Sequence, residues 1–82
     1  MENEFLSIAE QMIKTDLKID NDDMLILYGY YKQATIGDCN ISKPSMFNPR
    51  ELAKYDAWIN NNGVNKKNAM QRYIRKAKSL LK

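Results

Sequence analysis

Apolar residues recur at helical spacing along most of this chain, and no stretch shows the period-two alternation of a half-buried strand. Near the start, one helical face has apolar residues at the i, i+3, i+4 and i+7 positions, namely Phe5, Ile8, Ala9 and Met12. Near the end, a longer stripe of the same kind comprises Met70, Tyr73, Ile74, Ala77, Leu80 and Leu81. The pattern predicts an all-α protein.

Capping and breaking residues divide this pattern into four helices. Helix starts are indicated by N-cap residues, one of them followed by a proline, at Asp20, Asn48-Pro49 and Asn65. Helix ends are indicated by Gly37 and by the run Asn60 to Gly63, because these residues tolerate the left-handed conformation. We expect helices over residues 3–15, 20–36, 50–61 and 65 to the chain end, with an ordered loop over 38–48. A single four-helix bundle follows.

The length of the chain allows one compact domain. Its 82 residues, taken as a single domain over 1–82, would bury roughly 63% of the surface of the unfolded chain. The longest apolar run, residues 24–28, is far shorter than the ~20 residues of a membrane span. Glu2 and Glu4 stand where a secretory signal would have a basic region, so we expect a cytoplasmic protein.

The chain has no histidine and a single cysteine, Cys39. Triads and metal clusters that need histidine are therefore excluded, as are disulfide frameworks and cysteine-rich zinc sites. The three glycines are too far apart for a phosphate-binding loop. We expect no catalytic residues, no metal and no cofactor, and a binding role in place of enzymatic activity.

The two halves of the chain have opposite charge. Residues 1–41 contain three basic and eight acidic residues, 3 − 8 = −5, whereas residues 42–82 contain ten basic and two acidic residues, 10 − 2 = +8. A basic half in a small domain is typical of proteins that bind nucleic acid, an anionic membrane surface or a phosphorylated small molecule. An ordinary solvated helix face is the alternative interpretation.

The expected second helix has two different faces. At about 100° per residue, Leu25, Tyr28, Tyr31 and Lys32 share an arc of roughly 120°. A second face, with Leu27, Tyr30 and Ala34, is better suited to the core. The first face is either a half-buried aromatic edge with a lysine that extends to solvent, or a site for an aryl phosphate, in which tyrosine stacks on a base and lysine meets phosphate.

The stretch Tyr28 to Asp38, YGYYKQATIGD, resembles the signature of the acyl-coenzyme A binding proteins, Tyr-Gly-x-Tyr/Phe-Lys-Gln-Ala-x-x-Gly-Asp. The similarity continues through Pro44, Ala53 to Trp58, and Ala69 to Ile74, so it covers essentially the whole chain. It implies an up-down-down-up four-helix bundle with the first and last helices packed in parallel. It also implies a non-catalytic carrier of long-chain fatty acyl-CoA esters that maintains and transports the acyl-CoA pool.

The resemblance also implies roles for individual residues in binding the CoA head group. Tyr31 would stack on the adenine, Tyr28, Lys32 and Lys54 would hold the ribose 3′-phosphate and the diphosphate, and Tyr73 would complete the site. Arg50 and Lys18 would add positive charge near the groove. Ile13 is a further expected ligand-binding position; it stands where the family often has a basic residue, so the charge of that head-group contact would be lost.

An apolar groove across the bundle would hold the acyl chain. The residues expected to line or support this groove are Phe5, Ile8, Ala9, Met24 and Leu25. Positions that match the family's packing of the first helix on the last are Phe5, Ala9, Tyr73, Ile74 and Leu80. Ile19 replaces a proline common before the second helix, and Tyr55 replaces a frequent tryptophan.

Partners follow from the same interpretation. We expect acyl-CoA as the ligand, a monomer, no nucleic-acid partner and at most transient membrane contact. The competing hypothesis is a basic helical module that binds nucleic acid or another protein, which explains the charge of the second half but not the Tyr28, Tyr31 and Lys32 face.

Overall fold

The computed structural model describes residues 2–81, and four α-helices account for most of them. They are α1 (Glu2–Lys14), α2 (Asn21–Thr35), α3 (Pro49–Ile59) and α4 (Lys66–Leu80). No strand occurs in this part of the chain. The all-α prediction is confirmed, and most helix boundaries lie within one residue of the expected ones; the chain end, where the last helix was expected to finish, lies outside the described residues.

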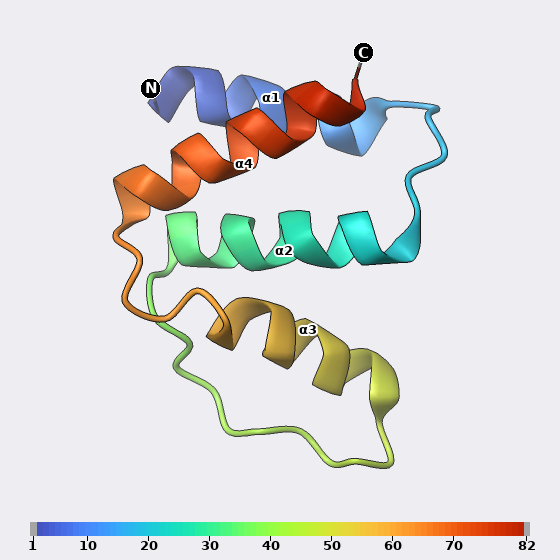
Figure 1. Ribbon diagram of the computed structural model, residues 1–82, viewed down its shortest axis with the longest axis vertical. Coiled ribbons are helices and arrows are strands. Elements are labelled where there is room, and N and C mark those ends of the chain that lie inside the picture. The colour runs from blue at the N-terminus through green and yellow to red at the C-terminus, as the bar shows by residue number, and fades with distance from the viewer. Residues whose placement is uncertain (1, 82) are drawn as a thin grey trace.

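Figure 1 shows α1 and α4 running in one direction and α2 and α3 in the other, which confirms the up-down-down-up order. The helix α2 packs between α4 and α3, while α1 packs against α4. Among the described helices, α3 therefore has α2 as its one packing partner. This arrangement leaves one face of α2 open between α1 and α3.

Local signals explain most helix boundaries. The side chains of Asp20 and Asn65 cap α2 and α4 as expected, because they accept hydrogen bonds from Asp23 N (2.9 Å) and Asn68 N (2.8 Å). Gly37 has φ +103°, which fits its expected place just after α2. Asn48 precedes α3, but its side chain makes no capping hydrogen bond, because its backbone is not in the extended conformation of the other two caps.

The expected end of the third helix at residue 61 is wrong. The helix α3 ends at Ile59, and Asn61 N and Asn62 N donate to carbonyls three residues earlier, at Trp58 and Ile59. These bonds tighten the chain into a turn that finishes at Gly63, where φ is +91°.

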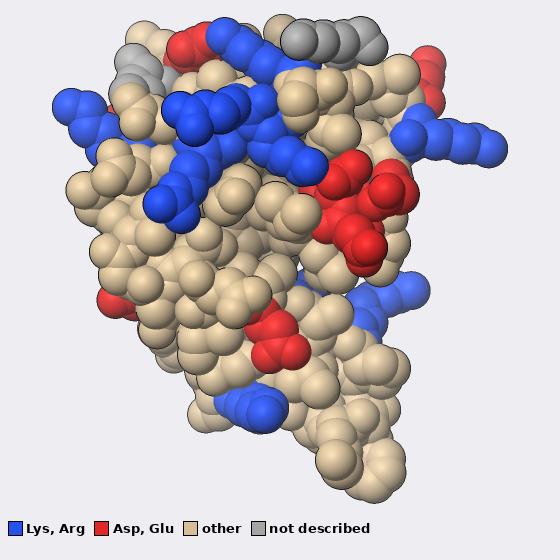
Figure 2. Space-filling view, viewed as in Figure 1, with Lys and Arg blue, Asp and Glu red and all other residues tan. Residues whose placement is uncertain are grey.

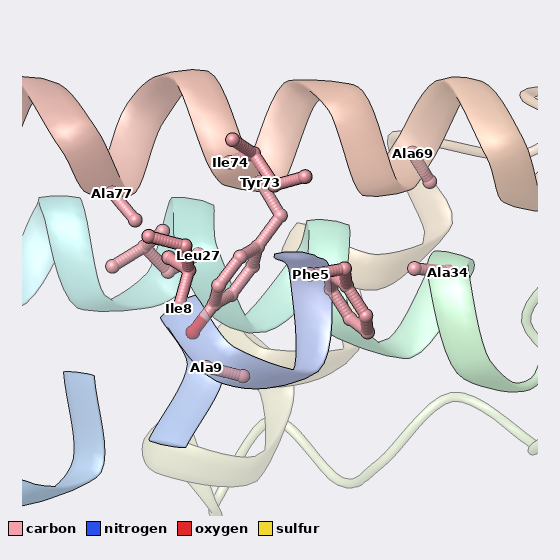
Figure 3. Close-up of a cluster of buried hydrophobic side chains, with 9 residues drawn as sticks. All are labelled: Phe5, Ile8, Ala9, Leu27, Ala34, Ala69, Tyr73, Ile74 and Ala77. Carbon is pink, nitrogen blue, oxygen red and sulfur yellow. The ribbon is translucent and has the colours of Figure 1, made fainter. Parts of the chain in front are cut away.

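The hydrophobic core lies where α1, α2 and α4 meet (Figure 3). Its buried members are Phe5, Ile8, Ala9, Leu27, Ala34, Ala69, Tyr73, Ile74 and Ala77. The apolar stripes of the first and last helices therefore face inward as predicted, as do Leu27 and Ala34 of the second. Small residues let the helices approach closely, and Figure 3 shows the side chains of Ala34 and Ala69 between α2 and α4. Met12, Tyr30, Met70 and Leu80 pack against this core but are only partly buried.

Close backbone approach and one indole hold α3 on α2. A Cβ atom at Gly29 would lie 2.2 Å from the carbonyl oxygen of Ala57, so a side chain at this position would push the two helices apart. Trp58 is 2% exposed, and its Nε1 donates to the carbonyl of Gly37 (2.8 Å). Together these contacts fix α3 beside the end of α2.

A polar junction joins the residues after α2 to the turn before α4. The fully buried Gln33 donates from Nε2 to Asp38 Oδ1 (2.9 Å) and to the carbonyl of Val64 (2.8 Å). The same Asp38 oxygen accepts from Gly63 N (2.8 Å). Part of the Tyr28–Asp38 motif therefore has a structural role, which was not predicted.

Candidate functional site

Two hollows lie side by side on the open face of α2. The first, about 390 Å³, lies between α1, α2 and α4 and is called here the α1–α2 hollow; its lining residues are Ala9, Met12, Ile13, Met24, Leu27, Tyr28, Tyr31 and Tyr73. The second, about 510 Å³, is called the α2–α3 hollow and is lined by Asn21, Met24, Leu25, Tyr28, Pro49, Arg50, Ala53 and Lys54. Met24 and Tyr28 line both hollows, so the two adjoin.

Two ammonium groups lie close to the Tyr28 ring. Lys32 Nζ lies 5.9 Å from the ring centroid of Tyr28 and 4.9 Å from that of Trp58, and Lys54 Nζ lies 5.5 Å from that of Tyr28. These distances are typical of cation–π contacts. Among residues 2–81, the one acid within ion-pair distance of Lys54 is Glu51, at 3.9 Å. Cations from α2 and α3 thus lie near Tyr28, which lines both hollows, and could bind an anion there; Lys54 lines the α2–α3 hollow, whereas Lys32 lines neither.

Burial raises the pKa of the Tyr28 phenol above its ordinary value of 10.0, and the negative charge of Glu51 adds to this shift. The hydroxyl therefore stays protonated at neutral pH and is able to donate a hydrogen bond to a phosphate oxygen. The nearby lysines supply the positive charge for the same anion.

Tyr31 and Tyr73, which line the α1–α2 hollow, cluster with the buried ring of Phe5, which does not line it. The ring centroid of Phe5 lies 5.8 Å from that of Tyr31 and 5.2 Å from that of Tyr73, and Tyr31 and Tyr73 are 6.1 Å apart. Tyr31 is 39% exposed, whereas Tyr73 is 5% exposed. Desolvation, and then the neighbouring Tyr31, raise the pKa of the Tyr73 phenol. Tyr31 is thus the ring of the three that presents surface to a planar ligand.

Most residues predicted for the site come together on this face. Ile13, 83% exposed, lies on the rim of the α1–α2 hollow, and the buried Ala9 lies at its base. Leu25 and Arg50 line the α2–α3 hollow. Lys18 is exposed in the segment between α1 and α2 and lines neither hollow.

Several contributors were not predicted as site residues. They are Met12, Asn21, Leu27, Pro49, Ala53 and Trp58. Met12 and Leu27 belong to core-facing stripes, and the sequence pattern alone does not show that these stripes also border a hollow. Trp58 supports the ammonium of Lys32 from α3, a contact that no spacing within one helix could reveal.

Other features of the molecule are less suited to an anionic ligand. A further hollow of about 540 Å³ between α2 and α3 includes Asp22 and Asp56, with no lysine or arginine among its lining residues. Within residues 2–81, no group of histidine, cysteine or acidic side chains could hold a metal ion. None of the helices described is long and apolar enough to cross a membrane.

The bundle and its open, amphipathic site define a small helical ligand-binding protein. Comparison of the sequence with protein-family models matches residues 2–77 to the family described as acyl-CoA binding protein. This chain belongs to the acyl-CoA binding protein family.

Curated relatives and solved structures agree with this assignment. The chain is 50% identical over 80 residues to an acyl-CoA-binding protein of Gossypium hirsutum, covering 98% of this chain and 90% of that protein. It superposes on the crystal structure of Oryza sativa acyl-CoA-binding protein 2 with a TM-score of 0.93 at 42% identity, covering 98% and 87% of the two chains. The crystal structure of the corresponding protein from Moniliophthora perniciosa gives a TM-score of 0.95 at 34% identity, covering 99% and 80%.

Proposed function

We propose that this protein is a non-catalytic carrier of long-chain fatty acyl-CoA esters. The observation that carries the proposal is the position of Tyr28, which lines both hollows and whose ring centroid lies 5.9 Å from the ammonium group of Lys32 and 5.5 Å from that of Lys54. An acyl-CoA combines a phosphorylated head with an apolar tail. The site combines cations with apolar walls in the same way.

The head group fits the cationic side of the site. In the proposal, Lys32, Lys54 and the Tyr28 hydroxyl hold the phosphates, and the exposed ring of Tyr31 stacks on the adenine. Arg50 adds charge from the first turn of α3. Ile13 offers no charge from α1, so this protein would hold the head group mainly from α2 and α3.

The tail fits the apolar walls. Met24 belongs to both hollows, and an extended chain that follows α2 would pass along this side chain. Full burial of about fifteen methylenes would contribute at most about 12 kcal/mol, at about 0.8 kcal/mol for each. The partly exposed lysines contribute less individually, so they select the head group while the tail provides most of the affinity.

The proposed role is to maintain and transport the acyl-CoA pool in the cytoplasm as a monomer. A site open to solvent along one face supports this role, because a carrier has to load and release its ligand without chemistry. The family membership supports a binding activity, and the Tyr28, Lys32 and Lys54 cluster accounts for the phosphorylated head.

Calorimetric titration with palmitoyl-CoA, below the concentrations at which micelles form, tests the proposal. Free CoA and palmitate are the controls. We expect tight 1:1 binding of palmitoyl-CoA and much weaker binding of either half alone. If palmitoyl-CoA does not bind, the carrier function is wrong and the basic surface of the second half becomes the leading candidate site.

A further inference from the structure

The turn that precedes α3 presents two apolar side chains to solvent. Phe47 is 90% exposed and Met46 is 76% exposed, and Phe47 is the most exposed large apolar side chain in the described part of the chain. Asn48 N donates to the carbonyl of Ser45 (3.0 Å), and Phe47 N donates to Ser45 Oγ (3.1 Å). These bonds fix the turn, so the two side chains are held outward by the backbone.

The segment that carries this apolar pair is basic. Residues 39–50 include Lys43 and Arg50 and no aspartate or glutamate. In the view of Figure 2, the lowest part of the molecule has no charged side chain at its tip, and basic side chains lie to the left of the tip and above it. Exposed apolar groups bordered by cations are typical of surfaces that bind anionic lipid.

The turn also lies beside the proposed ligand site. Figure 1 shows it at the lowest point of the view, next to the start of α3. Pro49 and Arg50, two and three residues after Phe47, line the α2–α3 hollow together with Met24. A surface that contacted Met46 and Phe47 would therefore lie close to residues that line that hollow.

We propose that residues 43–50 form a docking tip for anionic lipid bilayers, through which the protein exchanges its ligand with a membrane. This inference rests on the proposed function, because a long-chain acyl-CoA is an amphiphile that partitions into bilayers. Phe47 and Met46 insert among the acyl chains near the headgroups, and Lys43 and Arg50 meet the lipid phosphates. A stable protein partner would need about 800 Å² on each side, whereas two side chains on a cationic tip suffice for transient attachment to lipid.

Vesicle sedimentation without ligand tests the tip. The vesicles contain phosphatidylcholine alone or with about 30% phosphatidylserine, a composition that gives a negative surface potential. We expect wild-type protein to bind the anionic vesicles, and the double variant Met46→Ser/Phe47→Ser to bind them about fivefold more weakly or less. Leu6→Ser, which removes a half-exposed apolar side chain from α1, is the matched control and should bind as wild type does.

A second measurement follows transfer of palmitoyl-CoA from anionic vesicles to the protein. The double variant should load more slowly, yet bind palmitoyl-CoA in free solution with wild-type affinity, because neither side chain lines a hollow. The proposal is overturned if wild type does not bind anionic vesicles, if the double variant matches Leu6→Ser, or if the pair instead drives self-association in sedimentation velocity. A different result would contradict the proposed function: the wild-type protein would not bind palmitoyl-CoA in free solution.

Discussion

At the scale of single residues, the Lys32 ammonium lies over the rings of Trp58 and Tyr28, which hold it beside the proposed phosphate site. Lys32→Gln removes the charge and keeps most of the aliphatic stem. We expect the affinity for palmitoyl-CoA to fall about tenfold or more, because a hydrogen bond to a charged group contributes about 1.5–3 kcal/mol. Titration calorimetry measures the change.

The control for Lys32 removes a positive charge on another face. Arg72 is exposed on α4 and borders, with Tyr30 of α2, a hollow other than the two of the proposed site, so Arg72→Gln should bind palmitoyl-CoA as wild type does. Both variants should keep the wild-type melting temperature. Equal affinities of Lys32→Gln and Arg72→Gln would contradict the assignment of Lys32 to the head group.

Asp38 makes the folded protein sensitive to acid. The hydrogen bond from Gly63 N, and then that from Gln33, hold the pKa of its carboxyl below the ordinary value of 3.8. The carboxyl of Asp38 therefore binds a proton more readily in the unfolded chain than in the folded protein. The ionised carboxylate stabilises the fold at pH values above its ordinary pKa. This contribution to stability is lost as pH falls through the lowered pKa of the folded protein. Asp38→Asn should reduce stability at neutral pH and flatten the loss of stability on acidification.

Urea unfolding measured from neutral pH down to about pH 2.5 tests this prediction. Wild type and Asp38→Asn should differ most at neutral pH and converge in acid. Two parallel curves would show that the Asp38 carboxylate has no linked effect on stability.

Residues of one helix face could be predicted from spacing, but their partners from other elements could not. Tyr28, Tyr31 and Lys32 share a face because of helical geometry, and the structure places them on the open side of α2. The burial of Gln33 depends instead on Val64, 31 residues away. A polar residue in a helix gives no local signal of such a partner, so its burial was not predictable.

At the scale of elements, the caps of α3 and α4 are chemically alike and structurally different. The Asn65 side chain accepts from Asn68 N, whereas Asn48 makes no such bond. Asn65→Ala should therefore cost about 1 kcal/mol of stability, and Asn48→Ala a few tenths at most. Chemical denaturation of the two variants checks the difference, and equal losses would contradict it.

Gly29 sets the separation of α2 and α3. Replacing a glycine within a helix by alanine ordinarily increases the stability of the protein by about 1 kcal/mol. Here the new Cβ would lie 2.2 Å from the Ala57 carbonyl oxygen, so we expect Gly29→Ala to destabilise the protein by about 1–3 kcal/mol.

The sign of the change in stability decides this prediction. Ser7→Ala, on the exposed side of α1, is a control in which a smaller gain in helix propensity should appear without a clash. A Gly29→Ala variant as stable as Ser7→Ala would show that α3 can move away from α2 at little cost.

The presence of the four helices and most of their boundaries were predictable, because capping and helix-breaking residues act locally. Asp20, Asn65 and Gly37 behave as their residue types suggest. The end of α3 was less predictable, since asparagines at 60–62 fit either a last helical turn or the tighter turn that forms. The parallel packing of α1 and α4 came from the family resemblance, because periodicity does not specify which helices meet.

At the scale of the whole molecule, the opposite charges of the two halves partly pair. Lys76 of α4 contacts Asp23 of α2 (2.8 Å), and Lys78 contacts Glu4 of α1 (2.7 Å). Figure 2 shows a basic surface over α4 that borders an acidic one. Some cations of the second half therefore join helices, which weakens the case for a nucleic-acid interface on α4.

Ligand binding should stabilise the molecule and protect α1 in particular. The α1–α2 hollow separates these helices, and an acyl chain in it would connect Ala9 and Ile13 to α2. At a free palmitoyl-CoA concentration of about 100 times Kd, we expect about 2.7 kcal/mol of added stability. Thermal denaturation and hydrogen exchange test this, with slower exchange in α1 than in the free protein; free CoA at the same concentration should have little effect.

The packing of α1 on α4 also sets the order in which the molecule is assembled during synthesis. Phe5 meets Tyr73, and Glu4 meets Lys78, which is 74 positions further along the chain. The nascent polypeptide can pair α2 with α3 early, so the cations around Tyr28 come together first. The apolar wall contributed by α1 and α4 has to wait until α4 has been translated. A ribosome-bound chain that lacks α4 would thus expose the apolar face of α1, and it would need its last helix before it could bind an acyl chain.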